Sequence, residues 1–268
     1  MTRDDVTSTT ARWERYTATG DSFTEGLWGE PDPEGHPTGW ADLLAAELSA
    51  RRTAVGQPPL AYANLAVRGR LLRPILTEQV PRALRMGPDL ISIVGGGNDM
   101  LRPTVNVDVL ARNLEAAVAK ARAAGAHVLL ATGMDAKDSP IVRRTRPYVG
   151  MYNAHVWSIA RRHGASVLDV WGMRSLRDWR MWAPDRIHLN AEGHARVAQG
   201  ALAALGLEHD PEFDTPLPPA PVLTWIEEAR WNAEWARDWA FPWATRRLRR
   251  RSSGDTVTAK RPEVTPLD

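Results

Sequence analysis

The chain has 268 residues, of which 43% are hydrophobic and 25% charged, with a formal net charge of +2 and a pI of about 9.2. These values are ordinary for a folded globular protein and exclude a collagen-like, mucin-like or disordered body. Because the chain contains no cysteine, disulfide frameworks and thiolate chemistry are excluded as well.

The amino-terminal residues give no indication of export or membrane insertion. Residues 1–6 are polar and lack the apolar core of a secretory signal, and no run approaches the ~20 apolar residues that span a bilayer. We therefore expect a cytoplasmic protein. Most of the excess positive charge lies near the carboxyl end, in an arginine run over residues 246–251. Since the rest of the chain is close to neutral, we expect no nucleic-acid partner.

Short apolar runs alternate with helical patterns along most of the chain. The run 16–19 is β-branched, stops at Gly20 and predicts the first strand. After a loop rich in Gly, Pro and acidic residues, apolar positions spaced i, i+3, i+4 over 40–48 predict a helix. Further strands are expected at 60–66, 89–94, 126–132 and 165–170, and further helices at 71–80, 107–124, 148–162 and 191–205.

Strands that alternate with single helices predict a mostly parallel sheet with helices on both faces. We therefore expect one α/β domain over residues 1–209, with three layers (α/β/α) and a five-stranded sheet. The carboxyl ends of its strands should share one edge, where open α/β sheets bind their ligands. We expect four parts of the chain to meet at this edge: Ser22, Gly69, Asn98 and the segment that follows the fifth strand.

A serine, a histidine and an aspartate at this edge have the chemistry of a catalytic triad. A serine hydroxyl is a weak nucleophile at neutral pH, so it needs a base, and a third group must orient that base. His188 can accept the proton of Ser22, while Asp185, three positions earlier, can bind the other ring nitrogen. Negative charge that develops on the substrate can be held by the N–H groups of Ser22 and Gly69 and by the Asn98 amide.

Four short blocks, taken in this order, resemble the SGNH hydrolases, also called GDSL-type lipases and esterases. The blocks are Gly20-Asp21-Ser22, Asn64 to Gly69, Gly96-Gly97-Asn98-Asp99 and Asp185-Arg186-Ile187-His188. The resemblance implies the flavodoxin-like SGNH fold. It also implies Ser22 as the nucleophile, His188 as the base, Asp185 as its orienter, and Ser22, Gly69 and Asn98 as the oxyanion hole. Phe23 stands where the family name has leucine.

The sequence thus predicts an enzyme that hydrolyses small-molecule carboxylic esters, as an esterase, lipase or deacetylase, through an acyl-enzyme on Ser22. A thioesterase or acyltransferase with the same triad remains an alternative, as does a non-catalytic carbohydrate- or lipid-binding module on the same fold. The presence of a complete triad argues against the binding module. The oligomeric state and the natural ester are not predictable from the sequence.

No cofactor and no metal ion are expected. His188, His194 and Asp185 do not predict a metal site, because we expect His194 on the solvent face of its helix. Four apolar residues flank the nucleophile or follow the fifth strand, and we interpret them either as walls of the substrate pocket or as ordinary core residues: Phe23, Leu27, Trp28 and Trp171.

Residues 210–268 are expected to form an appendage that lies outside the four blocks. A proline-rich linker over 211–221 leads to a helix in which tryptophan recurs every four residues, at Trp231, Trp235, Trp239 and Trp243. Successive tryptophans turn by only about 40° around a helix of 3.6 residues per turn, so they form one stripe. The end of the chain is expected to be basic, polar and partly disordered.

Two main interpretations of the tryptophan stripe remain open. We favour packing on the protein's own body, because large aromatic stripes are usually buried. The alternative is reversible docking of the tryptophans and the adjacent arginines on an anionic membrane or on a partner. Nucleic acid is a weaker third option, since an arginine cluster gives affinity without any element that reads bases.

Overall fold

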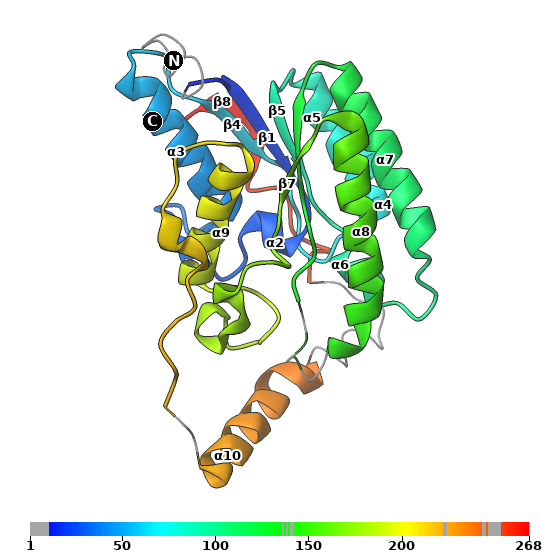
Figure 1. Cartoon of the computed structure of the whole chain (residues 1–268), viewed down its shortest axis with the longest axis vertical. Helices are drawn as coiled ribbons and strands as arrows, with labels where there is room; N and C mark the ends of the chain where they lie inside the picture. Colours follow the sequence, from blue (N-terminus) through cyan, green and yellow to red (C-terminus); the bar gives the residue numbers. More distant parts are fainter. Residues whose placement is uncertain are drawn as a thin grey trace.

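The computed structural model describes residues 11–135, 137, 139, 142–221, 224–242, 245 and 253–267. Its centre is a six-stranded sheet in the order β7-β6-β5-β1-β4-β8 (Figure 1). The strands are β1 (Arg15–Thr19), β4 (Ala61–Asn64), β5 (Leu90–Ile93), β6 (His127–Ala131), β7 (Ser166–Leu168) and β8 (Arg261–Pro266). The first five of these pair in parallel, and β8 runs antiparallel to β4 at one edge.

Helices cover both faces of this sheet, so the predicted three-layer α/β/α class is confirmed. On one face lie α3 (Trp40–Ala54) and α9 (Ala191–Ala204), and on the other α5 (Val80–Arg85), α7 (Val107–Ala123) and α8 (Arg146–His163) (Figure 1). The remaining elements are short. They are α2 (Ser22–Glu25), the hairpin β2 (Glu30–Pro31) and β3 (Pro37–Thr38), α4 (Leu72–Pro74), the π-helical turn η1 (Ile75–Gln79), α6 (Gly97–Met100), and 3₁₀ turns at Arg143–Thr145, Ser175–Arg177, Trp179–Met181 and Pro211–Asp214.

The helices form where the apolar spacing and the capping residues agree. In α7, Asn106 caps the amino end by accepting a hydrogen bond from the N–H of Val109. Its buried positions recur at helical spacing and face the sheet: Val107, Ala111, Leu114, Ala117, Val118 and Ala121.

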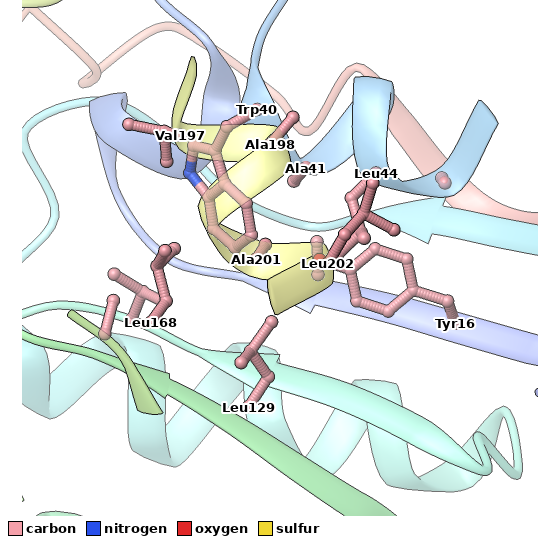
Figure 2. Close-up of a cluster of buried hydrophobic side chains, with 14 of the residues drawn as sticks. Tyr16, Trp40, Ala41, Leu44, Leu129, Leu168, Val197, Ala198, Ala201 and Leu202 are labelled. Atoms are coloured by element: carbon pink, nitrogen blue, oxygen red, sulfur yellow. The ribbon is translucent and has the colours of Figure 1, made fainter. Parts of the chain in front are cut away.

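Under α3 and α9, the side chains of both helices interlock with those of the sheet. Trp40 of α3 and Tyr16 of β1 are fully buried, and Leu202 of α9 lies between the helices and the sheet in Figure 2. Burial of large side chains in this layer stabilises the fold, at roughly 1.5–3 kcal/mol for each fully buried residue of the size of leucine.

The sixth strand corrects the expectation of five strands and of a disordered carboxyl end. Residues 261–266 pair with β4 as an edge strand. Because this strand contains Pro262 and Pro266, its sequence does not show the pattern of a strand. Proline is nevertheless tolerated at a sheet edge, where some N–H groups need no partner. Just before the strand, the ammonium group of Lys260 donates to the carbonyls of Glu25 and Pro37 and pairs with Asp42, so the strand is anchored to the amino-terminal half.

Ahead of β8, the tryptophan-rich segment forms α10 (Trp225–Trp235), which continues as a π-helical turn, η6 (Ala236–Ala240). The helix lies at one end of the molecule (Figure 1), and Trp231, Trp235 and Trp239 contact residues of the α/β/α body. Of the two interpretations, these contacts support packing on the body. Trp243 and the arginine run lie outside the described residues.

Candidate active site

The turn after β1 presents Ser22 at the carboxyl edge of the sheet. Asp21 caps the short helix α2 by accepting the N–H of Phe23 at 3.1 Å, so Ser22 is the first helical residue. A Cβ at Gly20 would lie 2.5 Å from the hydroxyl oxygen of Thr24, and this close approach requires glycine. The side-chain amide of Gln79, in η1, binds both the N–H and the carbonyl of Gly20 and fixes the turn.

Ser22, His188 and Asp185 form a continuous chain of hydrogen bonds. The Oγ atom of Ser22 lies 2.9 Å from Nε2 of His188, and Nδ1 of His188 lies 2.6 Å from Oδ2 of Asp185. A carboxylate can only accept, so Nδ1 carries the proton and Nε2 is free to accept from the serine hydroxyl. This is the tautomer that a general base for Ser22 requires.

Asp185 is held as an anion by several donors. Its Oδ1 atom accepts the N–H groups of Ile187 at 2.9 Å and His188 at 3.0 Å. Burial acts to raise the pKa of the Asp185 carboxyl, but the hydrogen bond and charge of His188, together with these N–H groups, outweigh it and bring the pKa below its usual range. The acid therefore remains ionised through the neutral range.

The loops after β4 and β5 lie beside the serine. Gly69 has a φ of 75°, a left-handed conformation that favours glycine. The buried carboxylate of Glu25 holds the same loop in place, because it accepts the backbone N–H of Arg68 and forms an ion pair with the Arg68 guanidinium. The Asn98 amide donates to the carbonyl of Arg70 at 3.0 Å and to Asp21 at 3.2 Å. Asn98 thus joins the two loops to the turn that carries Ser22.

A mostly apolar cavity of about 180 Å³ opens in front of Ser22 and His188. For comparison, a dry apolar cavity of about 150 Å³ can hold benzene. Phe23 and Leu27 line it, as do Asn98 and His194, whereas Gly69, Trp28 and Trp171 are not among its lining residues. Its apolar lining comes from the strand ends, from α8 and from the loop that carries His188, and includes Val94, Ala131, Met134, Val149, Trp182, Ile187 and Leu189.

Two of the residues considered as pocket walls, Trp28 and Trp171, do not line the cavity. The indole N–H of Trp28 donates to Oδ2 of Asp185 at 3.0 Å, so this tryptophan contacts the Asp185 carboxylate directly. The ring of Trp171 packs under the guanidinium of Arg146, with 5.1 Å between the guanidinium carbon and the ring centroid. No sequence signal indicated either contact, because the partners are far apart in the chain.

His194 is buried, so the expectation that it lies on a solvent face is wrong. It is 1% exposed, its Nδ1 accepts the N–H of Trp40 at 3.3 Å, and its Nε2 donates to the carbonyl of Leu27 at 3.2 Å. The signal was present in the sequence, since His194 shares the i, i+3, i+4, i+7 stripe of α9 with three buried apolar residues: Val197, Ala198 and Ala201.

The buried imidazole of His194 makes stability depend on pH. Burial lowers its pKa from 6.5 to about 4, so between these values the unfolded chain binds a proton that the folded chain does not. Stability therefore falls as the pH drops through this window, by about 3 kcal/mol at about 1.4 kcal/mol per pH unit.

His194→Gln is expected to remove this contribution, because an amide can make both hydrogen bonds without titrating. The measurement is the urea midpoint at pH 7 and pH 4 for wild type, His194→Gln and the control His155→Gln, in which the side chain replaced is 39% exposed. We expect the smallest change between the two pH values in His194→Gln. Equal changes in all three proteins would contradict this account of His194.

Within the described ranges, no group of three or more His, Cys, Asp or Glu side chains is arranged to hold a metal ion. In the same part of the chain, no helix combines the length and apolar character needed to cross a membrane.

The sequence profile of the GDSL-like lipase/acylhydrolase family matches residues 18–196. No curated protein sequence matches the chain. Among solved structures, LAE5, an α/β hydrolase enzyme from the metagenome of Lake Arreo, Spain, is 26% identical with a TM-score of 0.60, and the match covers 72% of this chain and 95% of that one.

The acetylxylan esterase Axe2 from Geobacillus stearothermophilus is 22% identical, with a TM-score of 0.60 over 73% of this chain and 95% of that one. At this identity the likeness shows the fold alone. The fold and the profile together define a three-layer α/β/α hydrolase of the ester-cleaving class. The chain belongs to the GDSL-like lipase/acylhydrolase family.

Proposed function

We propose that this protein hydrolyses carboxylic esters with small acyl groups through a covalent acyl-enzyme on Ser22. The observation that carries the proposal is the hydrogen-bonded chain from Ser22 through His188 to Asp185 at the mouth of an apolar cavity. Catalytic mutants of Axe2 replace a serine, a histidine and an aspartate, the aspartate three positions before the histidine. The same spacing separates Asp185 from His188 here.

In the proposed reaction, His188 takes the proton of Ser22 while Oγ attacks the ester carbonyl carbon. The carbonyl oxygen becomes an oxyanion, held by the N–H groups of Ser22 and Gly69 and by the Asn98 amide, which exchanges one of its present acceptors, the Arg70 carbonyl or Asp21, for the oxyanion. His188 then gives the proton to the leaving alcohol, and the C–O bond of the ester breaks. Water, deprotonated by His188, attacks the acyl-enzyme and releases the acid and free Ser22.

The cavity supports a small acyl group as the preferred one. A volume of about 180 Å³ has room for an acyl chain of up to about six carbons, judged by the benzene-sized cavity above. Its apolar wall provides no partner for a charged acyl group. A thioesterase or an acyltransferase would use the same steps with another leaving group or acceptor, and turnover of a thioester or transfer to an added alcohol would reveal either activity.

A chain-length series of p-nitrophenyl esters tests the size of this pocket. We expect kcat/KM to be highest between acetyl and hexanoyl and to fall at least about tenfold by palmitoyl, because a longer chain must leave part of its apolar surface in water. A flat profile would contradict a small apolar acyl pocket.

A pair of matched variants locates the pocket. Val149→Phe places a larger side chain on the cavity wall and should shift the optimum toward acetyl. Val109→Phe, at a position 37% exposed on α7, should leave the profile unchanged.

A further inference from the structure

Helix α10 packs against the loop that carries Asp185 and His188. The guanidinium of Arg186 lies between two rings of that helix, 3.6 Å from the centroid of Trp231 and 4.7 Å from that of Trp235. Its Nη1 atom donates to the side chain of Asn232 at 2.7 Å. Arg186 is only 5% exposed, and among the described residues no carboxylate forms an ion pair with it. Aromatic faces hold such a desolvated cation well.

The same helix reaches the triad acid itself. The indole N–H of Trp235 donates to the backbone carbonyl of Asp185 at 3.1 Å. From the other side, Trp28 donates to the Asp185 carboxylate at 3.0 Å, and its ring packs edge-on against Trp239 with centroids 5.3 Å apart. Asp185 therefore accepts one hydrogen bond on its side chain, from Trp28, and one on its backbone carbonyl, from Trp235. Trp235 belongs to α10, and Trp28 packs against Trp239 of η6.

The backbone is strained at these contacts. Among the described residues, only Trp28 and Arg186 combine a side chain with a positive φ, at 71° and 55°. Such a conformation is unfavourable for residues with a Cβ atom and persists only where the surroundings hold it. Both residues touch α10 or η6, so these two elements add to the hydrogen bonds within the loop that hold Asp185 in place.

Most of α10 contributes little to the core of the protein. Trp225 is 78% exposed and Ile226 54% exposed, and α10 contains no buried residue. Its contacts with the body are concentrated on the loop of the triad acid, where Trp231, Asn232 and Trp235 converge. Loss of these contacts should therefore affect the position of the loop more than the stability of the fold.

We propose that α10 and η6 clamp the catalytic loop, with Trp28, Arg186 and Trp235 acting as positioning residues for Asp185 and, through it, His188. The inference rests on the proposed function, since it concerns the same triad. A catalytic group displaced by about 1 Å can cost a factor of about 10² in rate, so even a loose clamp should lower kcat while the acyl cavity keeps its shape.

Trp235→Phe tests the clamp, because it removes the N–H donor and keeps an aromatic ring. The matched control is Trp225→Phe, at the exposed end of the same helix. Both are made in the full chain, since truncation before α10 would also remove β8. With p-nitrophenyl acetate, we expect Trp235→Phe to lower kcat about five- to tenfold with KM changed by less than about twofold, and Trp225→Phe to match wild type.

A double-mutant cycle with Asp185→Asn separates positioning from a structural role. If Trp235 acts through Asp185, Trp235→Phe should cause little further loss in the Asp185→Asn background. Asn232→Ala is a second variant at an exposed helical position where alanine favours folding, and it should lower kcat about threefold by freeing Arg186.

Three results would overturn the clamp. They are wild-type kcat in both Trp235→Phe and Asn232→Ala, equal losses from Trp235→Phe in the two backgrounds, or an equal loss in Trp225→Phe. A wild-type chain without any ester turnover would overturn the proposed function and the clamp with it, whereas an active wild type matched by both Trp235→Phe and Asn232→Ala would overturn the clamp alone.

Discussion

Asp185→Asn is expected to lower kcat by about 10⁴-fold, the order of loss seen when a triad acid becomes an amide. An amide that keeps its oxygen toward the N–H groups of Ile187 and His188 must turn its NH₂ toward His188. Nδ1 would then have to accept, the proton would move to Nε2, and Ser22 would lose its base. The NH₂ would also face the indole N–H of Trp28.

The measurement is kcat with p-nitrophenyl acetate, with circular dichroism to show an intact fold. Asp108→Asn is the matched control, because Asp108 is an exposed aspartate of α7 that contacts His155, and it should keep the wild-type rate. An Asp185→Asn variant with more than about a tenth of the wild-type kcat would leave only a Ser22–His188 pair as the catalytic unit.

His188→Ala is expected to cost about 10⁶-fold in kcat, since a serine triad without its base loses nearly all of its covalent chemistry. The effect should be non-additive. The double variant Ser22→Ala, His188→Ala should be no slower than either single variant, because serine and histidine act as one unit.

Steady-state turnover of p-nitrophenyl acetate measures this loss, and His155→Ala, on the surface of α8, provides the control. If the double variant were slower than both single variants by the product of their effects, His188 would be acting independently of Ser22, and its assignment as the base would be wrong.

Much of the fold could be predicted because its signals are local. Apolar β-branched runs such as 16–19 and 89–94 gave strands within a residue or two of β1 and β5, and Asn106 marked the start of α7. The motif residues Ser22, Asn98 and His188 could be placed together because parallel strands end at one edge.

The parts that could not be predicted depend on contacts between distant residues. β8 contains two prolines and has no alternating apolar pattern, so only its pairing with β4 identifies it. Gln79 binds Gly20 across 59 positions, and Trp28 reaches Asp185 across 157. Composition and spacing indicate that such side chains are polar or aromatic, but the partner of each is determined by the tertiary packing.

The tryptophan-rich segment shows the same difference between local patterns, which are predictable, and tertiary contacts, which are not. Its four-residue tryptophan period predicts a helix with one aromatic face and favours packing on the body, and α10 (Trp225–Trp235) lies in this segment. The period does not show which surface is covered. In the structure that surface is the loop that carries Asp185, which the helix contacts through Arg186 and the Asp185 carbonyl, so a segment outside the four motif blocks contacts the candidate active site.

Covalent labelling is the measurement that tests the proposed acyl-enzyme on Ser22 most directly. The full chain is incubated with a serine-directed p-nitrophenyl phosphonate, and its intact mass and the labelled peptide are determined. We predict one adduct per chain on Ser22, no adduct in Ser22→Ala, and unchanged labelling in Ser158→Ala, which alters a serine of α8 whose hydroxyl donates to the carbonyl of Ala154. A wild-type chain that stays unlabelled, or a Ser22→Ala chain labelled as fast as wild type, would contradict it.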